Sequence, residues 1–532
     1  MGRTLSGALC GIVAAGTGVA VAELSAAATR PQAGPLVAVG AAVIDATPTA
    51  VKEFAVREFG THDKPILLTG IAVVLALLAA LAGVAATRWR LAVPAGALIL
   101  GGAGAAAALS RPAATPVDAL PSLLGAVVAG AALWWLTRPR EGGAAANDRH
   151  GPVPATPDVP REAAPATPGV PREAAPATPA QPGVDRRLVM RLALLAAGAG
   201  AAEATALSLA GRQETAAGRT REMLRLPAPA DPAPALPRGT APGFTTGNDV
   251  FYRVDTALSV PRIDPATWRL RLHGMVDREI EVSLADLLRQ PLIERDITLN
   301  CVSNEVGGPY IGTARWLGVP LAALLREAGI RAGADQIVAR SVDGMTIGTP
   351  LATALDGRDT MLAVGMNGEP LPLEHGFPVR MLTPGLYGYA GACKWLTEIE
   401  LTTFEQVDAY WVERGWSPGG TVKTASRIDR PAPFAKLSPG PVTVAGVAWA
   451  QRRGITAVEV SVDGGPWEQA ELLPTASVDT WTQWRYSWAA TAGSHTLAVR
   501  ATDRTGAVQP QSRVTPFPDG ATGWHTVTVT VG

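Results

Sequence analysis

The chain has 532 residues with 46 basic and 46 acidic side chains, so its formal net charge is zero and a basic nucleic-acid-binding surface is not expected. Charged residues make up 17% and hydrophobic residues 47%, and the apolar ones are concentrated in the N-terminal part. The three cysteines, Cys10, Cys301 and Cys393, are too few for a disulfide framework.

Five N-terminal segments are long and apolar enough to cross a bilayer core of about 30 Å. They are residues 5–26, 65–86, 91–109, 120–136 and 188–210. The stretch 36–44 is too short and meets Asp45, so we expect it to lie outside the membrane. Glu23 and Glu203 are the ionisable exceptions within the spans, and no span contains a His, so an anchor is favoured over a haem-carrying or proton-conducting bundle.

Cationic residues at the segment ends predict the orientation, because such residues are retained on the cytoplasmic side. They are Arg3, Arg88, Arg90, Arg138, Arg140, Arg186, Arg187 and Arg191. All of them fall on one side if Met1 is cytoplasmic. The sequence therefore predicts a multi-pass protein of the cell membrane whose residues after 210 are extracytoplasmic.

Two Pro-rich segments separate the predicted parts. After the four-span region 1–140, residues 141–184 contain an eleven-residue repeat, 155–165, that recurs at 166–176 with one change. Dense Pro predicts an extended, solvated linker. The fifth span, within 185–211, opens with Arg186 and Arg187, which resemble a twin-arginine export signal or are ordinary cytoplasmic-side arginines. A second Pro-rich tether is expected at 212–242.

The remaining residues are enough for two globular domains. In residues 243–430, alternation predicts a strand at 268–274, and apolar spacing predicts helices at 283–289 and 320–329. Residues 431–532 form an all-β domain by the same criteria. Its expected strands are 442–449, 455–462, 481–488, 496–502 and 524–531.

Cys301 stands where a strand-like run meets a Gly-rich turn, in Asn300-Cys301-Val302-Ser303-Asn304. A thiolate in a polar turn could be a nucleophile, a redox switch or a soft metal ligand. The alternative is a buried small hydrophobic residue, because free Cys is among the most buried residue types. Taken alone, the residue favours this second interpretation.

Several short motifs surround Cys301 in a characteristic order. They are Val260–Asp264, Trp268–Gly274, Ile311–Trp316, Gly318–Leu321, Met366–Pro372, His375–Arg380, Pro384-Gly385 and Lys394–Leu396. Together they give residues 249–402 a specific resemblance to the oxidoreductase molybdopterin-binding domain of the sulfite oxidase family. The C-terminal domain resembles the immunoglobulin-like dimerisation domain that follows it in that family. The implied fold is a helical membrane anchor, an α+β Mo-pterin domain and an all-β sandwich.

The resemblance implies one Mo-molybdopterin per chain, with Cys301 as the metal ligand, and no haem is evident. The positions that match cofactor-holding residues are Tyr252, Arg253, Asp343, His375, Arg380, Ala392, Cys393 and Lys394. Arg380 and Lys394 suit an anionic phosphate, the first by bidentate bonds and the second as a point charge. Tyr310 and Arg315 are further catalytic candidates, with Arg315 alternatively bracing Trp316, and Tyr387 and Tyr389 are candidates for the cavity mouth.

One departure from the family bears on the substrate. Sulfite-oxidising members carry an Arg pair shortly after the ligand Cys, and this chain has Glu305 and Val306 there. An acidic and an apolar residue would not attract the sulfite dianion, so plain sulfite oxidation is disfavoured.

Three functions follow. The first is two-electron oxygen-atom transfer on a small sulfur or nitrogen compound. The second is reduction of sulfoxides, as in the periplasmic protein-methionine-sulfoxide reductases of the same superfamily. A non-catalytic surface scaffold is the third, disfavoured because the Cys and the anion-binding residues are present. The sequence has no cytochrome b5-like segment and no Cys-x-x-Cys-His motif, so electrons are expected to pass to or from a separate cytochrome or quinol-linked protein. The sandwich suggests a homodimer.

Overall fold

The computed structural model describes residues 3–48, 51, 54–55, 58–59, 63–89, 91–111, 114–138 and 186–532. The predicted linker with its repeat lies outside the described residues. The chain divides into two compact units, of which the first is helical (Met1–Val39, Pro65–Leu109 and Thr115–Ser208). The second unit contains Leu209–Gly532 together with two short N-terminal segments.

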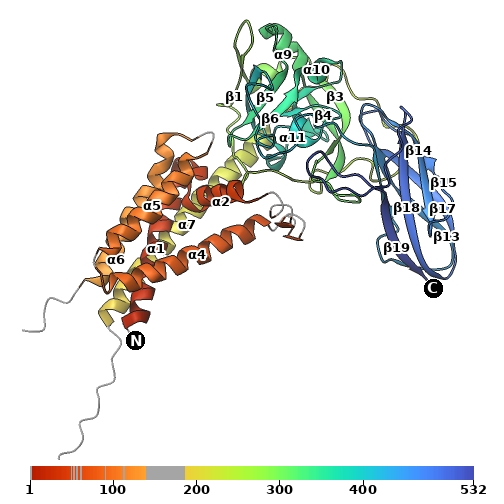
Figure 1. Cartoon of the computed structure of the whole chain (residues 1–532). Helices are drawn as coiled ribbons and strands as arrows, with labels where there is room; N and C mark the ends of the chain where they lie inside the picture. Colours follow the sequence, from red (N-terminus) through yellow and green to blue (C-terminus); the bar gives the residue numbers. More distant parts are fainter. Residues whose placement is uncertain are drawn as a thin grey trace, which may run out of the picture. The chain divides into compact units, whose positions relative to one another are not determined.

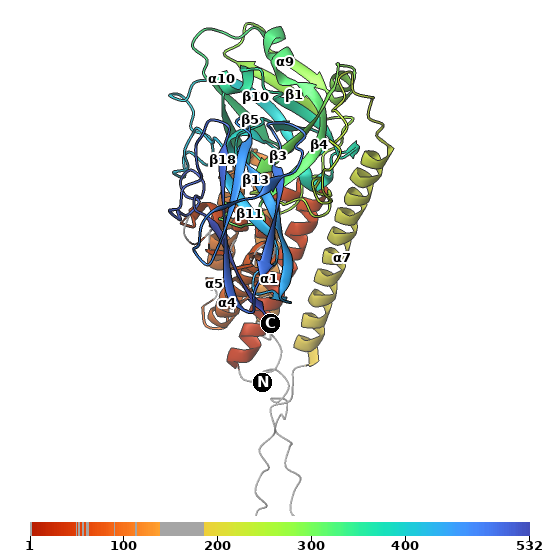
Figure 2. The same ribbon diagram turned by 90° about the vertical axis from the view of Figure 1, so that its right-hand side faces the viewer.

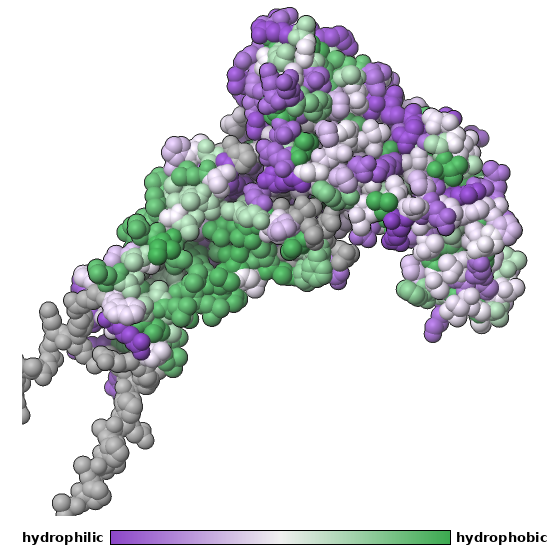
Figure 3. Space-filling view, in the orientation of Figure 1, coloured by the Kyte–Doolittle hydropathy of each residue, from purple (hydrophilic) through white to green (hydrophobic). Residues whose placement is uncertain are grey.

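Five helices in the described part of the chain are long and apolar enough to cross a membrane, in agreement with the five predicted segments. They are α1 (Arg3–Ala28), α4 (Asp63–Ala86), α5 (Ala92–Leu109), α6 (Leu120–Thr137) and α7 (Arg186–Met223), seen from two sides in Figures 1 and 2. The shorter helix α2 (Pro35–Ala46) covers the stretch expected outside the membrane. On the face of the helical unit that Figure 3 shows, apolar residues make up a large part of the surface, which is compatible with a membrane anchor.

Small residues let α1 pack closely against two neighbouring helices. A Cβ atom on Gly11 would overlap the carbonyl oxygen of Ala79 in α4. In the same way, a Cβ on Gly18 would overlap the carbonyl oxygen of Gly125 in α6. Such backbone-to-backbone contact is typical of helices that associate within membranes, where packing replaces the hydrophobic driving force.

The second Pro-rich segment, residues 212–242, was predicted to be a tether. The structure contradicts this prediction, because the segment is part helix and part extended chain bound to the folded region. Helix α7 continues to Met223, and the extended residues after it bind the folded region. The Ala230 amide donates to the Leu292 carbonyl at 2.8 Å, and the Ala241 amide donates to the Gln483 side chain at 3.0 Å. Proline lacks an amide donor, but the residues between the prolines keep theirs, so the segment can still pair with neighbouring strands.

Residues 243–424 form an α+β domain with two mixed or antiparallel sheets. The first sheet has the order β3 (Ile293–Asn300), β4 (Ile311–Pro320), β7 (Met361–Met366) and β8 (Glu369–Pro370), with β9 (Arg380–Leu382) paired to β7. The second has the order β2 (Ile280–Ser283), β1 (Arg269–Gly274), β10 (Leu396–Thr402), β5 (Gln336–Ser341) and β6 (Thr346–Pro350). The helices are α8 (Leu284–Leu288), α9 (Leu321–Ala328), α10 (Leu351–Leu355) and α11 (Gly388–Gly391). The predicted strand 268–274 and both predicted helices are confirmed.

The β3–β4 hairpin places the Cys301 turn. The two strands are antiparallel, and Asn300 at the end of β3 pairs with Ile311 at the start of β4. Residues 301–310 therefore form the connection between them, at one end of the sheet. Strand β7 beside β4 is buried along its whole length, as its continuous apolar run requires, and it anchors the hairpin in the core.

The C-terminal domain is a sandwich of two sheets, as predicted. The first sheet has the order β11 (Ala425–Arg430), β13 (Gly440–Trp449), β17 (Thr482–Ala490) and β16 (Glu471–Leu472). The second has the order β12 (Lys436–Leu437), β19 (His525–Val531), β18 (Gly493–Asp503), β14 (Ile455–Val462) and β15 (Glu468–Gln469). All five predicted strands are present. Strand β11 precedes the predicted boundary at 431, so the domain begins earlier, near residue 425.

The C-terminal domain covers the free edge of β3. This strand ends its sheet, and its Thr298 has no partner strand on the outer side. The Thr298 amide donates to the Asp479 carbonyl at 2.9 Å, the Trp481 amide donates to the Thr298 hydroxyl at 2.8 Å, and the Gln451 side chain donates to the Thr298 carbonyl at 3.2 Å. A loop of the sandwich thus satisfies the backbone of β3 three residues before Cys301.

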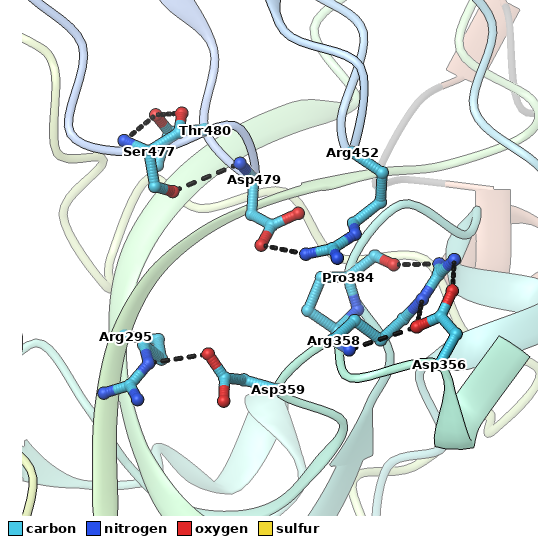
Figure 4. A network of polar contacts seen from close by, with 9 residues as sticks. All are labelled: Arg295, Asp356, Arg358, Asp359, Pro384, Arg452, Ser477, Asp479 and Thr480. Atoms are coloured by element: carbon cyan, nitrogen blue, oxygen red, sulfur yellow. Dashed lines mark hydrogen bonds and ion pairs between the residues drawn. The ribbon is translucent and has the colours of Figure 1, made fainter.

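Charged side chains surround this junction on both domains (Figure 4). On the C-terminal domain, Arg452 pairs with Asp479 at 3.0 Å, and the Asp479 amide donates to the Ser477 hydroxyl. On the other domain, Arg295 pairs with Asp359 at 2.7 Å. Burial raises the pKa of Asp479, and the charge of Arg452 opposes this rise. Each of these pairs lies within one domain, so charged side chains flank the junction on both sides.

Candidate active site

A cavity of about 610 Å³ lies beside the 301–310 turn. This volume is within the range of about 300–1,000 Å³ that is typical of small-molecule sites. Its walls come from distant parts of the chain, around residues 251–256, 299–310, 341–345, 375–395 and 411–416, with residues 515–516 from the C-terminal domain. Both domains thus contribute to one cavity.

Hydrogen bonds across the turn hold Cys301 in place. Its amide donates to the Tyr310 carbonyl at 3.0 Å, and the Tyr310 amide donates to the Asn304 side chain at 2.8 Å. The Asn304 amide in turn donates to the Cys301 carbonyl at 3.0 Å. The thiol is 9% exposed, and its sulfur lies 2.9 Å from the Ser303 hydroxyl. The side chain is fixed, yet it faces the cavity.

The Cys301 thiol cannot form a metal site from protein groups alone. Among the residues that the structure describes, no three His, Cys, Asp or Glu side chains gather as a metal site. Burial raises the pKa of Cys301, against the Ser303 hydrogen bonds and the charge of Lys394, so the free thiol stays protonated at neutral pH. A metal would displace that proton and take its other ligands from a bound cofactor.

Arg380 provides an unpaired positive charge in the cavity wall. The residue is 6% exposed, its Nη1 donates to the His375 carbonyl at 3.1 Å, and its Nε has no hydrogen-bond partner. Within the described ranges, no carboxylate pairs with it. Burial lowers the pKa of Arg380 to about 10, so it remains charged at neutral pH. A buried cation with unused donors fits an anionic ligand.

Lys394 and Ser341 extend this polar end of the cavity. The Lys394 ammonium donates to Asp255 at 2.7 Å and to the Glu374 carbonyl at 3.2 Å. Burial works against ionisation of Asp255, but the charges and hydrogen bonds of Lys394 and Lys64 together outweigh it and hold the pKa of Asp255 low. The buried Ser341 hydroxyl lacks a partner. The donor set, with its unsatisfied buried atoms, fits a polar, anionic cofactor such as the pterin phosphate of molybdopterin.

Aromatic rings support the wall between Arg380 and Cys301. Tyr252 stacks on Phe251, with ring centroids 5.2 Å apart, and lies 6.3 Å from the Tyr310 ring. His375 packs edge-on against Phe251 at 5.6 Å, and its Nε2–H donates to the Asn248 carbonyl at 2.9 Å. Burial lowers the pKa of His375 to about 4, so its ring is neutral at pH 7. This wall is rigid and carries no charge of its own.

Most of the predicted site residues come together around the cavity. Those that line it are Tyr252, Cys301, Tyr310, Asp343, His375, Arg380, Ala392 and Lys394. Glu305 and Val306 also line it, where the family's sulfite-binding arginines are expected. Of the two candidate mouth tyrosines, Tyr389 lines the cavity and Tyr387 does not.

Three predicted site residues lie elsewhere. Arg315 does not line the cavity: its guanidinium pairs with Asp296 at 2.8 Å, because its side chain leaves β4 on the face that carries Asp296. Arg253 is 49% exposed and lies 3.9 Å from Glu374, so it does not face the cavity. Cys393 is buried in the hydrophobic core, where burial raises its pKa.

Sequence reasoning did not single out several residues of the cavity wall, among them Asp255, Ser341, Trp411, Trp416, Thr515 and Pro516. Trp411 and Trp416 lie in an aromatic-rich stretch whose composition could have singled them out. Thr515 and Pro516 belong to a loop of the other domain, and nothing in the local sequence links that loop to the site. Only the packing of the two domains brings them there.

The C-terminal domain also holds the turn after Cys301. Gly307 has φ +79°, and a Cβ on it would overlap the imidazole of His525. The Arg427 guanidinium donates to the Gly308 carbonyl at 2.9 Å. The His525 Nδ1 accepts from the Ile428 amide at 2.9 Å, which fixes the ring. The turn is thus held from outside its own domain.

Comparison with known proteins identifies the same regions. Residues 257–411 match the profile of the oxidoreductase molybdopterin binding domain, and residues 425–499 match that of a bacterial Ig domain. Mitochondrial sulfite oxidase of Mus musculus is 35% identical over 286 residues, which are 46% of this chain and 51% of that protein. Sulfite oxidase of Gallus gallus is 32% identical over 335 residues, which are 53% of this chain and 72% of that protein.

The chain belongs to the sulfite oxidase family of molybdopterin-dependent oxidoreductases. It spans about half the length of the mouse relative and more of the chicken one. Among solved structures, the sulfane dehydrogenase SoxCD from Paracoccus pantotrophus matches with a TM-score of 0.48 and 25% identity, over 55% of this chain and 82% of that one. The molybdopterin-domain match, residues 257–411, includes Cys301 and most of the cavity-lining residues and leaves the helical unit outside it.

We predict that Gly307→Ala loosens the Cys301 turn. A side chain at positive φ costs roughly 1–2 kcal/mol, and the added Cβ must also displace His525. In the cofactor-free protein, alkylation of Cys301 should accelerate about tenfold or more, a factor worth about 1.4 kcal/mol. Peptide mass spectrometry after timed alkylation measures the rate.

Gly464→Ala is the matched control, because Gly464 has φ +70° and open space around its Cβ position. It carries the same backbone strain without the clash and should leave the alkylation rate of Cys301 unchanged. Equal rates in the two variants would show that His525 does not hold the turn.

Proposed function

We propose that this chain is a molybdopterin-dependent oxidoreductase that transfers an oxygen atom to or from a small sulfur or nitrogen compound. The observation that carries the proposal is that a buried thiol, Cys301, and an unpaired buried cation, Arg380, open on one cavity. When bound, the Mo-pterin group would supply two-electron redox chemistry and oxo transfer, with thiolate as a soft ligand.

Different residues of the chain would bind different parts of this cofactor. Arg380 and Lys394 would bind its anionic part, and Ser341 and Asp343 offer hydrogen-bonding atoms to its heterocycle. Cys301 would give up its proton and bind the metal. Tyr252 keeps its hydroxyl proton because burial raises its pKa, so it can donate a hydrogen bond toward the cavity.

Metal analysis tests this proposal. The full chain, purified from a host that makes the cofactor, should hold close to one molybdenum per chain, and Cys301→Ala should lower turnover more than about 100-fold, beyond the 10–100-fold typical of outer-shell residues. Cys393→Ala is the control, because this thiol lies in the core and not in the cavity. Clearly substoichiometric metal in the wild-type chain, or full activity of Cys301→Ala, would contradict the proposal.

The charge of the cavity favours a second, narrower candidate, the reduction of sulfoxides. The lining contains two cations, Arg380 and Lys394, and three carboxylates, Asp255, Glu305 and Asp343. The cofactor would occupy the cations, which leaves no positive charge for a dianion such as sulfite. A sulfoxide is neutral and needs none.

Replacing Glu305 and Val306 by arginine tests whether the lack of free positive charge in the cavity disfavours sulfite as a substrate. The wild-type chain should reduce dimethyl sulfoxide with a reduced viologen dye and should oxidise sulfite poorly. The double variant should gain about tenfold in kcat/KM for sulfite, the equivalent of about 1.4 kcal/mol. Glu327→Arg changes charge outside the cavity, and it should give no gain. Efficient sulfite oxidation by the wild-type chain would refute the explanation.

We further propose that the helices anchor the catalytic domain on the extracytoplasmic side of the cell membrane. The flanking arginines support this orientation. A separate cytochrome or quinol-linked protein would exchange electrons with the site, and a homodimer through the C-terminal domain stays a prediction. Protease added to spheroplasts should digest the region after residue 243. Protection of that region until the cells are lysed would reverse the orientation.

A further inference from the structure

A second group of aromatic rings lines the cavity, apart from the group at Tyr252. Trp416 lies 5.9 Å from the Tyr389 ring and 6.4 Å from the Trp411 ring, between their centroids. On its other side, the Phe517 ring packs edge-on at 5.3 Å. The Tyr389 hydroxyl donates to the Ser417 carbonyl, so it is already satisfied within the protein. Tyr389, Trp411 and Trp416 line the cavity with largely apolar ring surface, while the buried Trp416 Nε1 has no hydrogen-bond partner.

The C-terminal domain completes this part of the wall. Thr515 and Pro516 line the cavity next to the aromatic group, and Phe517 follows them in sequence against Trp416. Pro516 is buried and Thr515 is exposed, which places Thr515 at the rim. We call the five cavity-lining residues, Tyr389, Trp411, Trp416, Thr515 and Pro516, the aromatic subsite. It contains no charged side chain.

We propose that the aromatic subsite binds the apolar substituent of an uncharged organic sulfoxide, with aryl groups preferred over methyl. This inference rests on the proposed function and narrows its substrate class. Sulfur makes favourable contacts with aromatic rings, and an aryl group adds stacking and buried apolar area that a methyl group lacks. A charged substituent would lose its hydration without gaining a partner.

The reaction balances with a reductant that is not part of this chain. A one-electron carrier delivers two electrons in turn, two protons come from solvent, the S=O bond breaks, and the products are a thioether and water. Glu305 is exposed and lines the cavity, so solvent protons have a polar route to the reacting oxygen. The substituents on sulfur stay unchanged throughout, and they are what the aromatic subsite distinguishes.

Calorimetric binding of sulfones tests the subsite without turnover. Methyl phenyl sulfone should bind the detergent-solubilised holoenzyme about tenfold more tightly than dimethyl sulfone, because an aromatic pair contributes about 0.5–1.5 kcal/mol beyond area burial. Trp411→Leu should abolish most of that preference. Trp467→Leu is the matched control, because Trp467 packs on Trp524 and does not line the cavity, and it should keep the preference.

Thr515→Trp is a second variant, for the case that Trp411→Leu does not fold. Thr515 is exposed, so its replacement should not disturb folding and should only narrow the entrance of the aromatic subsite. This variant should weaken the aryl sulfone about tenfold and raise KM for methyl phenyl sulfoxide more than KM for dimethyl sulfoxide. If wild type binds both sulfones equally, or both variants keep the aryl preference, the subsite assignment is overturned. Turnover of both sulfoxides with no aryl preference would overturn only the subsite, whereas a metal-loaded chain that turns over neither would overturn sulfoxide reduction itself.

Discussion

Cys301 follows an edge strand whose backbone is completed by another domain. A strand edge presents amide and carbonyl groups that must find partners, and unpaired groups are costly once they are buried. In this chain two loops of the sandwich supply those partners to Thr298, three residues before Cys301: the Asp479 carbonyl accepts its amide, and the Gln451 side chain donates to its carbonyl. The position of the thiol therefore depends on the docking of the C-terminal domain, and so does the cavity that this domain helps to enclose.

The same docking brings the C-terminal domain into contact with the Cys301 turn and the cavity. His525 packs against Gly307, Arg427 binds the Gly308 carbonyl, and Thr515 and Pro516 line the cavity. One face of the sandwich thus holds the turn after Cys301, and an adjacent loop lines the cavity. Under the proposed function, changes in this domain would alter substrate choice without touching Arg380, which lines the other part of the cavity.

Much of this architecture was predictable because its signals are local. The strands of the sandwich, helices α8 and α9 and the five apolar helices follow from alternation, capping and hydropathy. Most of the site residues predicted from the ordered motifs around Cys301 line the cavity. Contacts between distant segments were not predictable in this way. Arg315 pairs with Asp296 across the hairpin, and the segment after α7 binds a neighbouring strand although it is rich in Pro. Thr515 reaches the cavity only through domain packing.

The central claim is that Cys301 binds the metal while the buried cations hold the rest of the cofactor. Molybdenum X-ray absorption on the wild-type chain and on Cys301→Ser measures this most directly, because it counts the sulfur atoms bound to the metal. The account predicts that the variant keeps its dithiolene sulfurs and has one sulfur neighbour fewer than the wild-type chain. An unchanged sulfur count in the variant would contradict the account.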